Sequence, residues 1–250
     1  RPESRGNPMP RGFWDYGVNP SGIITAPRIG PAELAVRLGS IVSYDRMGEV
    51  FWLDSFESGF QRWTAAYVGT PGEVVLKADG PRSGAYSMGL RASLVADREA
   101  GIDLYTSTPT QSRLGLEASF QLWSDTSILE MRIAAANPTL SPIFALRYNI
   151  QSSTVQRLNN ASAWVTLATG IQLFSIDRSY STIKLVVDPA NRNYVRATIA
   201  GQVYDLAGLP GPGGGGVSFP SVYVRIAHIA DGSNNNWVYV DDVIITHNEP

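Results

Sequence analysis

From Glu49 onward, apolar and polar residues alternate along most of the chain. The clearest example is LGLEASFQLW at 114–123. Its apolar residues fall at every second position and are predicted to face inward: Leu114, Leu116, Ala118, Phe120 and Leu122. The remaining side chains point the opposite way: Gly115, Glu117, Ser119, Gln121 and Trp123. A period of two residues indicates a β-strand with one buried face.

Further strand-like segments follow at short intervals, separated by turn-rich sequences such as ANPTLSP and DPANRN. They are 128–136, 143–151, 163–168, 182–188, 193–201, 221–229 and 237–246. No rhythm of alternating strands and helices is visible, which disfavours a parallel α/β sheet. No fixed-period repeat suggests a propeller or a solenoid. We therefore predict an all-β fold, an antiparallel two-sheet β-sandwich of the jelly-roll kind over residues 50–250.

Residues 1–49 have a different character. Prolines and glycines recur there and prevent a regular sheet or a long helix. The segment also carries apolar side chains that a disordered tail would not normally contain: Phe13, Trp14, Tyr16, Ile23 and Ile24. One short helix is predicted at 31–40, with Pro31 in its first turn and Gly39 as its stop. We expect an extended N-terminal arm that lies on a surface, either its own or a neighbour's.

Composition excludes several classes of function. The formal net charge of -2 provides no basic stripe, so the sequence disfavours nucleic-acid binding. The absence of cysteine excludes a disulfide framework, a cysteine-based zinc site and a thiol nucleophile. No apolar run reaches the ~18 residues of a membrane-spanning helix.

Three segments in a fixed order carry a family resemblance: LDSFESGFQRW (53–63), SGAYSMGLRA (83–92) and WVYVDDVIIT (237–246). Together they resemble jelly-roll carbohydrate-binding modules and the wider concanavalin A-like sandwiches. The stretch 183–206 is similar to a strand, turn and two further strands of the lectin-like sandwiches. The arm has no place in that pattern, and an apolar arm before a single sandwich resembles surface proteins of virions and other assemblies. Motif order implies a fold more strongly than it implies a function.

The last strand carries two adjacent carboxylates, Asp241 and Asp242, although Asp is depleted from strands. Strict alternation predicts that they point to opposite faces and that at most one is buried. The resemblance implies a structural Ca²⁺ bound by Glu57 and one of these two aspartates, with backbone carbonyls near Ser83 and Gly84 completing the shell. Such a mixture of hard oxygens suits calcium. The alternative is that Asp242 caps backbone amides and Asp241 is solvated.

Catalytic residues are harder to find. A sandwich glycosidase needs two carboxylates on one strand face, and the only such pair, Asp97 and Glu99, falls in the turn-like segment 95–101. His228 shares a strand face with apolar residues, which favours a core or rim histidine, and His247 also stands alone. We therefore predict that the protein is not an enzyme.

Aromatic residues beside polar ones provide a functional signal, because sugar rings stack on flat aromatics while polar groups bond to the hydroxyls. The predicted glycan-binding candidates are Glu117, Gln121, Trp123, Arg147, Asn149, Tyr194 and Arg196. The alternative is that tryptophans such as Trp63, Trp123, Trp164 and Trp237 pack in the core or contact the arm.

Two compatible functions follow. The first is a non-catalytic structural subunit of a surface assembly, whose arm clasps neighbouring copies and whose sandwich is displayed outward. The second is a carbohydrate-binding module that recognises a polysaccharide, and a lectin-like glycosidase is a third alternative. The first two imply a homo-oligomer or neighbouring subunits, a glycan partner, and an extracellular, virion-surface or cell-surface location.

Overall fold

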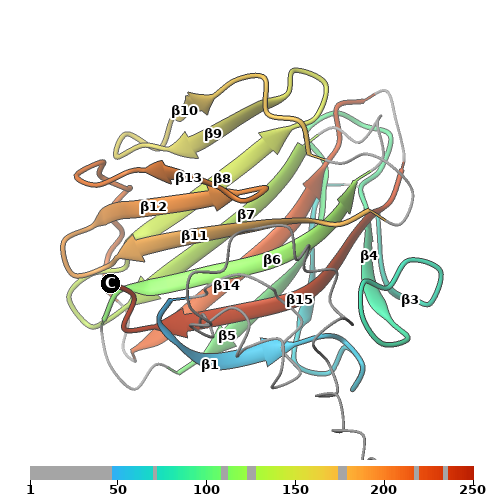
Figure 1. The fold of residues 1–250 in the computed structure, drawn as a ribbon, viewed down its shortest axis with the longest axis horizontal. Helices are drawn as coiled ribbons and strands as arrows, with labels where there is room; N and C mark the ends of the chain where they lie inside the picture. Colours follow the sequence, from blue (N-terminus) through green and yellow to red (C-terminus); the bar gives the residue numbers. More distant parts are fainter. Residues whose placement is uncertain are drawn as a thin grey trace, which may run out of the picture. The chain divides into compact units, whose positions relative to one another are not determined.

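The computed structural model describes residues 47–69, 72–107, 112–122, 128–173, 179–216, 220–232 and 236–250. Within these ranges the regular structure consists of β-strands in two antiparallel sheets that form a sandwich (Figure 1). The predicted all-β class and two-sheet architecture are therefore confirmed. No helix in this part of the chain has the length and apolarity needed to cross a membrane.

The predicted arm lies almost wholly outside the described residues. This applies to the helix expected at 31–40 and to the apolar residues Phe13, Trp14, Tyr16, Ile23 and Ile24. The arm and its clasping role therefore stay predictions.

The first sheet, called sheet A, has an unbroken antiparallel order of seven strands, with an eighth strand attached to one of them. In spatial order the seven are β13 (Gln202–Asp205), β12 (Asn193–Ile199), β11 (Ser181–Asp188), β6 (Leu114–Leu122), β15 (Val238–His247), β4 (Ser87–Arg91) and β3 (Glu73–Lys77). The eighth strand, β1 (Glu49–Asp54), pairs with β15. The predicted run of a strand, a turn and two more strands at 183–206 corresponds to β11, β12 and β13.

The second sheet, sheet B, lies behind sheet A in Figure 1. Its spatial order is β10 (Trp164–Ala168), β9 (Thr154–Leu158), β8 (Ile143–Asn149), β7 (Ile128–Ala136), β14 (Ser221–Ile229), β5 (Glu99–Thr106) and β2 (Thr64–Val68). Strands β7 and β14 have the bounds that the apolar alternation predicts. The predicted strand at 143–151 ends at Asn149, and the chain then turns into β9.

The inward faces of both sheets form one apolar core. It contains Leu116 and Phe120 from β6, Ile102 from β5, Val224 from β14 and Phe144 from β8. Burial of each such side chain stabilises the fold by roughly 1.5–3 kcal/mol. The core thus follows directly from the period-two pattern of the sequence.

One tyrosine connects the two sheets through the core. Tyr194 of β12 donates its hydroxyl hydrogen to the carbonyl of Leu158 in β9, at 2.8 Å, and accepts the N–H of Ala145 in β8, at 3.0 Å. Its ring packs edge-on against Phe144. A buried hydroxyl needs such partners, because an unpaired polar group in the core is destabilising.

Strand β15 changes partner halfway along its length. One of its edges pairs with β6, whereas the other pairs with β4 through Val238–Val240 and with β1 through Val243–His247. Asp241 and Asp242 therefore lie where neither β4 nor β1 supplies backbone hydrogen bonds. This position explains why a central strand tolerates two carboxylates.

Candidate functional site

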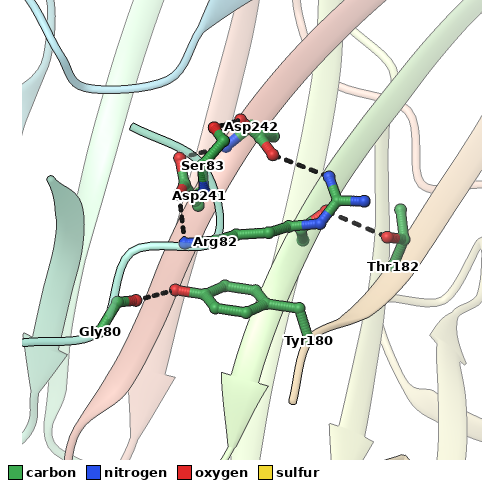
Figure 2. Close-up of polar contacts among 8 residues, drawn as sticks. Gly80, Arg82, Ser83, Tyr180, Thr182, Asp241 and Asp242 are labelled. Atoms are coloured by element: carbon green, nitrogen blue, oxygen red, sulfur yellow. Dashed lines mark hydrogen bonds and ion pairs between the residues drawn. The ribbon is translucent and has the colours of Figure 1, made fainter. Parts of the chain in front are cut away.

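Asp241 and Asp242 are both fully buried and both bind the segment that precedes β4 (Figure 2). Asp241 Oδ2 accepts the backbone N–H of Arg82 at 2.8 Å and that of Ser83 at 3.2 Å. Asp242 Oδ2 lies 2.7 Å from Nη1 of Arg82, and Asp242 Oδ1 accepts the hydroxyl of Ser83 at 2.9 Å. The two side chains thus replace the missing neighbour strand with their own hydrogen bonds.

A β-bulge brings the two carboxylates together. Between Asp241 and Ile244 the register of β15 shifts relative to β6, and Asp242 has a φ of 52°. An extra residue in one strand interrupts the alternation of side chains. The prediction that the two aspartates point to opposite faces, with at most one buried, is therefore wrong. The alternative without calcium assigns the capping of backbone amides to Asp242 and leaves Asp241 in solvent. In the structure Asp241 caps the amides, and both aspartates are buried.

Glu57 holds the next part of the same segment. Its Oε1 accepts the backbone N–H groups of Ala85 and Tyr86, each at 2.8 Å. Between the two groups of amides lies Gly84, with a φ of 64°. A Cβ at this position would collide with the carboxylate of Glu57. Three carboxylates therefore fix residues 82–86, which explains why the three sequence motifs occur together.

This arrangement does not fit the predicted calcium site. The carboxylates of Glu57, Asp241 and Asp242 all accept N–H or O–H donors, and the guanidinium of Arg82 already lies against Asp242. In the part of the chain that the structure describes, no group of three or more acidic, histidine or cysteine side chains is placed to hold a metal. The calcium prediction is not supported, because the positive charge beside Asp242 belongs to Arg82.

Burial dominates the electrostatics of this cluster. Burial and, to a smaller extent, the adjacent Asp242 raise the pKa of Asp241 to about 7, against the effect of the three amides that donate to the carboxylate. Burial also raises the pKa of Asp242, which Ser83 and Arg82 oppose. Nearby, Tyr180 donates its hydroxyl to the carbonyl of Gly80, and burial raises the pKa of that phenol (Figure 2). The carboxylates of Asp241 and Asp242 are thus engaged by Arg82 and Ser83 and are not turned toward solvent.

The glycan candidates predicted on β6 do not form an accessible surface. Glu117 and Gln121 point away from the core, as the alternation predicts, but both are buried. Trp123 lies outside the described residues. Lys184 of β11 lies opposite Glu117 and pairs with Glu249 at 2.7 Å. Burial removes Glu117 and Gln121 from contact with a glycan.

The other candidates are distributed over different parts of the sandwich. Tyr194 belongs to the core, so its assignment to a glycan-binding surface is wrong. Arg196 pairs with Glu249 on sheet A. Asn149 of sheet B accepts the N–H of Ser152 at 3.1 Å and shapes the turn after β8. Arg147 lies on the outer side of sheet B, and the predicted residues therefore do not share one face.

The outer side of sheet B collects the polar and aromatic side chains that these assignments missed. They lie on six neighbouring strands, from β5 through β14, β7, β8 and β9 to β10. We call this surface the polar face, and its members are Glu99, Asp103, Tyr105, Glu130, Arg132, Arg147, Gln156, Trp164, Tyr223 and Arg225. Cross-strand pairing connects them directly: Tyr223 lies opposite Tyr105, and Arg225 lies opposite Asp103 and Arg132.

Aromatic rings mark both ends of the polar face. The rings of Tyr105 and Tyr223 lie with centroids 4.8 Å apart and an interplanar angle of 35°. Tyr105 is 69% exposed, because it lies near the end of β5, beyond the residues of that strand that pair with β2. At the other end, the guanidinium of Arg147 lies 4.2 Å from the centre of the Trp164 ring. Such pairs present flat apolar surface and polar groups side by side.

Ion pairs and hydrogen bonds fix the groups between the rings. Arg225 pairs with Glu99 at 2.6 Å, Arg132 pairs with Glu130, and Tyr223 donates its hydroxyl to Asp103 at 3.1 Å. Burial raises the pKa of Glu130, which Arg132 opposes and Glu99 reinforces. The carboxylates of β5 and β7 thus lie on one face. Neither strand has two carboxylates at positions i and i+2, the spacing by which a sequence indicates a catalytic pair on one strand.

A signal for this face was present in the sequence. In EAGIDLYT (99–106), Glu99, Asp103 and Tyr105 alternate with Ile102 and Leu104 in the pattern that identified β6. The interpretation of 95–101 as turn-like hid the start of that strand. That β5, β14 and β7 are neighbours is a property of the topology, which alternation within one strand does not show.

Comparisons with known proteins agree with this fold. No protein-family profile matches the chain, and no curated protein matches its sequence. Among solved structures, it is similar to the carbohydrate esterase vb_24B_21 from Shiga toxin-encoding bacteriophage phi24B, with 13% identity, a TM-score of 0.54, and coverage of 81% of this chain and 100% of that chain. The chain shares the β-sandwich fold of that structure.

Two further structures support the same conclusion. The carbohydrate recognition domain of Emp46p in its potassium-bound form has 8% identity and a TM-score of 0.50, with 80% of this chain and 95% of that chain covered. A protein of unknown function with a galectin-like fold from Bacillus subtilis has 12% identity and a TM-score of 0.51, with 81% and 97% covered. At these identities the likeness establishes the fold, and the site must be argued from the residues of this chain.

Proposed function

We propose that the polar face of sheet B binds a glycan. The observation that carries the proposal is the combination of accessible aromatic rings with fixed charged and amide groups on one sheet. Tyr105 and Tyr223 provide one aromatic pair, and Trp164 with Arg147 provides a second. Sugar rings stack on such rings, while their hydroxyl groups exchange hydrogen bonds with side chains of the Arg, Glu and Gln types.

Two of the similar solved structures are a carbohydrate recognition domain and a carbohydrate esterase, which supports a sugar as the ligand. Preorganisation supports it as well, because the ion pairs of Arg225 and Arg132 hold polar groups in place before a ligand arrives. A glycan-binding role agrees with the extracellular or surface location that the sequence predicts.

Binding of the full chain to a glycan array, followed by titration of the best ligand, tests the proposal. Tyr105→Ala and Trp164→Ala are expected to weaken binding by about tenfold or more, since ~1.4 kcal/mol corresponds to a tenfold change in affinity. Tyr86→Ala is the matched control, because Tyr86 is an exposed tyrosine that precedes β4 of sheet A. Equal binding by the wild type and both test variants would contradict the proposal.

We propose binding without catalysis, as the sequence predicts. Because one of the similar structures is a carbohydrate esterase, sugar esters such as acetylated glycans are the substrates with which to test for catalysis. The chain is expected to bind them without releasing acetate. Acetate release that stops in Glu130→Gln would instead assign catalysis to the polar face.

The assembly role predicted for the arm is a separate proposal, and it is compatible with glycan binding. It is supported by the apolar residues of the proline-rich segment 1–49. Light scattering of the full chain is expected to show an oligomer, and Phe13→Ser with Trp14→Ser is expected to dissociate it. A wild-type chain that is monomeric at high concentration would refute this role.

A further inference from the structure

Arg147 is held in one orientation by two contacts on the polar face. Its Nε donates to Oε1 of Gln156 at 2.7 Å, and its guanidinium lies over the ring of Trp164. These partners come from β9 and β10, the two strands that follow β8 in the sheet. The plane of the guanidinium is thus fixed, and its terminal Nη groups are not used by either contact.

The charge of Arg147 is balanced differently from the charges of the other arginines on the polar face. Arg225 pairs with Glu99, and Arg132 pairs with Glu130. Within the described residues Arg147 forms no ion pair, and its electrostatic partners are Glu130, which already pairs with Arg132, and Asp97. Burial lowers the pKa of Arg147, because part of its hydration is lost without a carboxylate in contact.

A partly desolvated guanidinium with a free pair of Nη groups is suited to a planar or tetrahedral anion. Two parallel N–H donors bind a carboxylate or a sulfate in bidentate fashion, with charge-assisted hydrogen bonds. The adjacent Trp164 offers an aromatic surface for the ring that would carry this group. Both features lie on the face that is proposed to bind the glycan.

We propose that the glycan recognised by the polar face is acidic and that Arg147 binds its anionic group, a uronic acid carboxylate or a sulfate ester. This inference rests on the proposed function and specifies the class of ligand. Arg147 would then decide between charged and uncharged polysaccharides, whereas Tyr105 and Trp164 would contribute to the binding of both.

Pairs of ligands that differ only in charge provide the test. Polygalacturonate is compared with its methyl ester, and dextran sulfate is compared with dextran, by titration of the full chain. The wild type is expected to bind at least one charged polymer about tenfold or more tightly than its uncharged counterpart. A preference within the first pair identifies the carboxylate, and a preference within the second identifies the sulfate ester.

Arg147→Gln is expected to abolish that preference, and Arg147→Lys to lose most of it, since an ammonium lacks the two-pronged geometry. Arg157→Gln is the matched control: it removes the same charge from neighbouring β9, where Arg157 lies opposite Leu146 on the core side. It is expected to retain the preference. Thermal melting verifies that each variant folds.

A wild type that binds charged and uncharged polymers equally would overturn the inference, as would a preference that persists in Arg147→Gln. In both cases, continued loss of binding in Tyr105→Ala would leave the proposed glycan-binding function standing. If the wild type binds no polysaccharide, the proposed function fails first, and the assignment of Arg147 fails with it.

Discussion

The guanidinium of Arg82 lies 2.7 Å from Oδ2 of Asp242, a carboxylate with no exposed surface. Removal of one partner from a buried ion pair leaves an uncompensated charge, which typically costs about 3 kcal/mol or more. We therefore expect Arg82→Met to lower the free energy of unfolding by roughly that amount. Chemical unfolding at neutral pH measures it. Arg62→Met is the control, since Arg62 is exposed in the loop between β1 and β2, and a similar loss there would contradict the role of Arg82.

The same pair predicts how the protein responds to metal ions. Because Arg82 supplies the positive charge beside Asp242, neither added Ca²⁺ nor a chelator is expected to change the melting temperature of the wild type. A chelator that lowers the melting temperature of the purified chain would restore the calcium site predicted from the sequence. Differential scanning calorimetry with and without chelator provides the measurement.

Gly84 is expected to tolerate no side chain while Glu57 is present. Gly84→Ala meets two costs, the left-handed φ of 64° and displacement of the Glu57 carboxylate from two amides. The first costs roughly 1–2 kcal/mol, and the two lost hydrogen bonds add about 1–3 kcal/mol. Gly170→Ala isolates the first cost, because Gly170 has a φ of 71° and no atom within 4 Å of the added Cβ.

Unfolding of both variants by urea measures this difference. In a Glu57→Ala background, Gly84→Ala is expected to cost no more than Gly170→Ala, since the clashing carboxylate is gone. If Gly84→Ala and Gly170→Ala are equally costly in the wild-type background, Glu57 does not hold this segment.

Local alternation was sufficient to predict the sandwich, since it identifies which residues of β6, β7 and β14 face the core. It failed at β15 because a bulge with Asp242 in the left-handed region reverses the facing of the residues that follow. The motif resemblance names Glu57 together with Asp241 and Asp242, and in the structure all three bind residues 82–86. It could not show that Arg82 supplies the cation, because that contact joins residues 160 positions apart in the sequence.

The polar face could be predicted only in part, for a different reason. Alternation marks Arg147 on its own strand, but it allows Trp164 to pack in the core and does not distinguish Tyr223 or Arg225. Tyr223 and Arg225 join the face because β14 lies between β5 and β7 in the sheet, although β14 follows both strands in the sequence. Tyr194 illustrates the opposite error: its strand looks mostly polar, yet the side chain points inward and crosses to the other sheet.

His228 is expected to make stability depend on pH. The sequence predicts a core or rim histidine, and the side chain is fully buried, with Nδ1 accepting the N–H of Ala92 at 3.2 Å. Burial lowers its pKa from 6.5 to about 4. Between these values the unfolded chain binds a proton that the folded chain does not, so stability decreases as pH falls through this window, by up to about 3 kcal/mol.

Urea unfolding between pH 7.5 and 4.5 tests this dependence in the wild type and in His228→Asn. Asn retains an acceptor for Ala92 but does not titrate, so the variant is expected to lose less stability on acidification. The difference between the two curves is the informative quantity, because Asp241, whose pKa is raised, contributes a slope of the opposite sign. Parallel curves would contradict the assignment of the lowered pKa to His228.

Tyr194→Phe is expected to destabilise the sandwich without affecting glycan binding. The change removes only the hydroxyl, which leaves the N–H of Ala145 and the carbonyl of Leu158 unpaired in the core. An unsatisfied buried polar group costs about 1–3 kcal/mol. Tyr204→Phe removes the same atom from β13, where the hydroxyl bonds to the exposed side chain of Gln202, and is expected to cost less than about 0.5 kcal/mol. Unfolding curves measure both changes, and ligand titration separates the two roles of Tyr194: weaker glycan binding at unchanged stability would return this tyrosine to the binding surface.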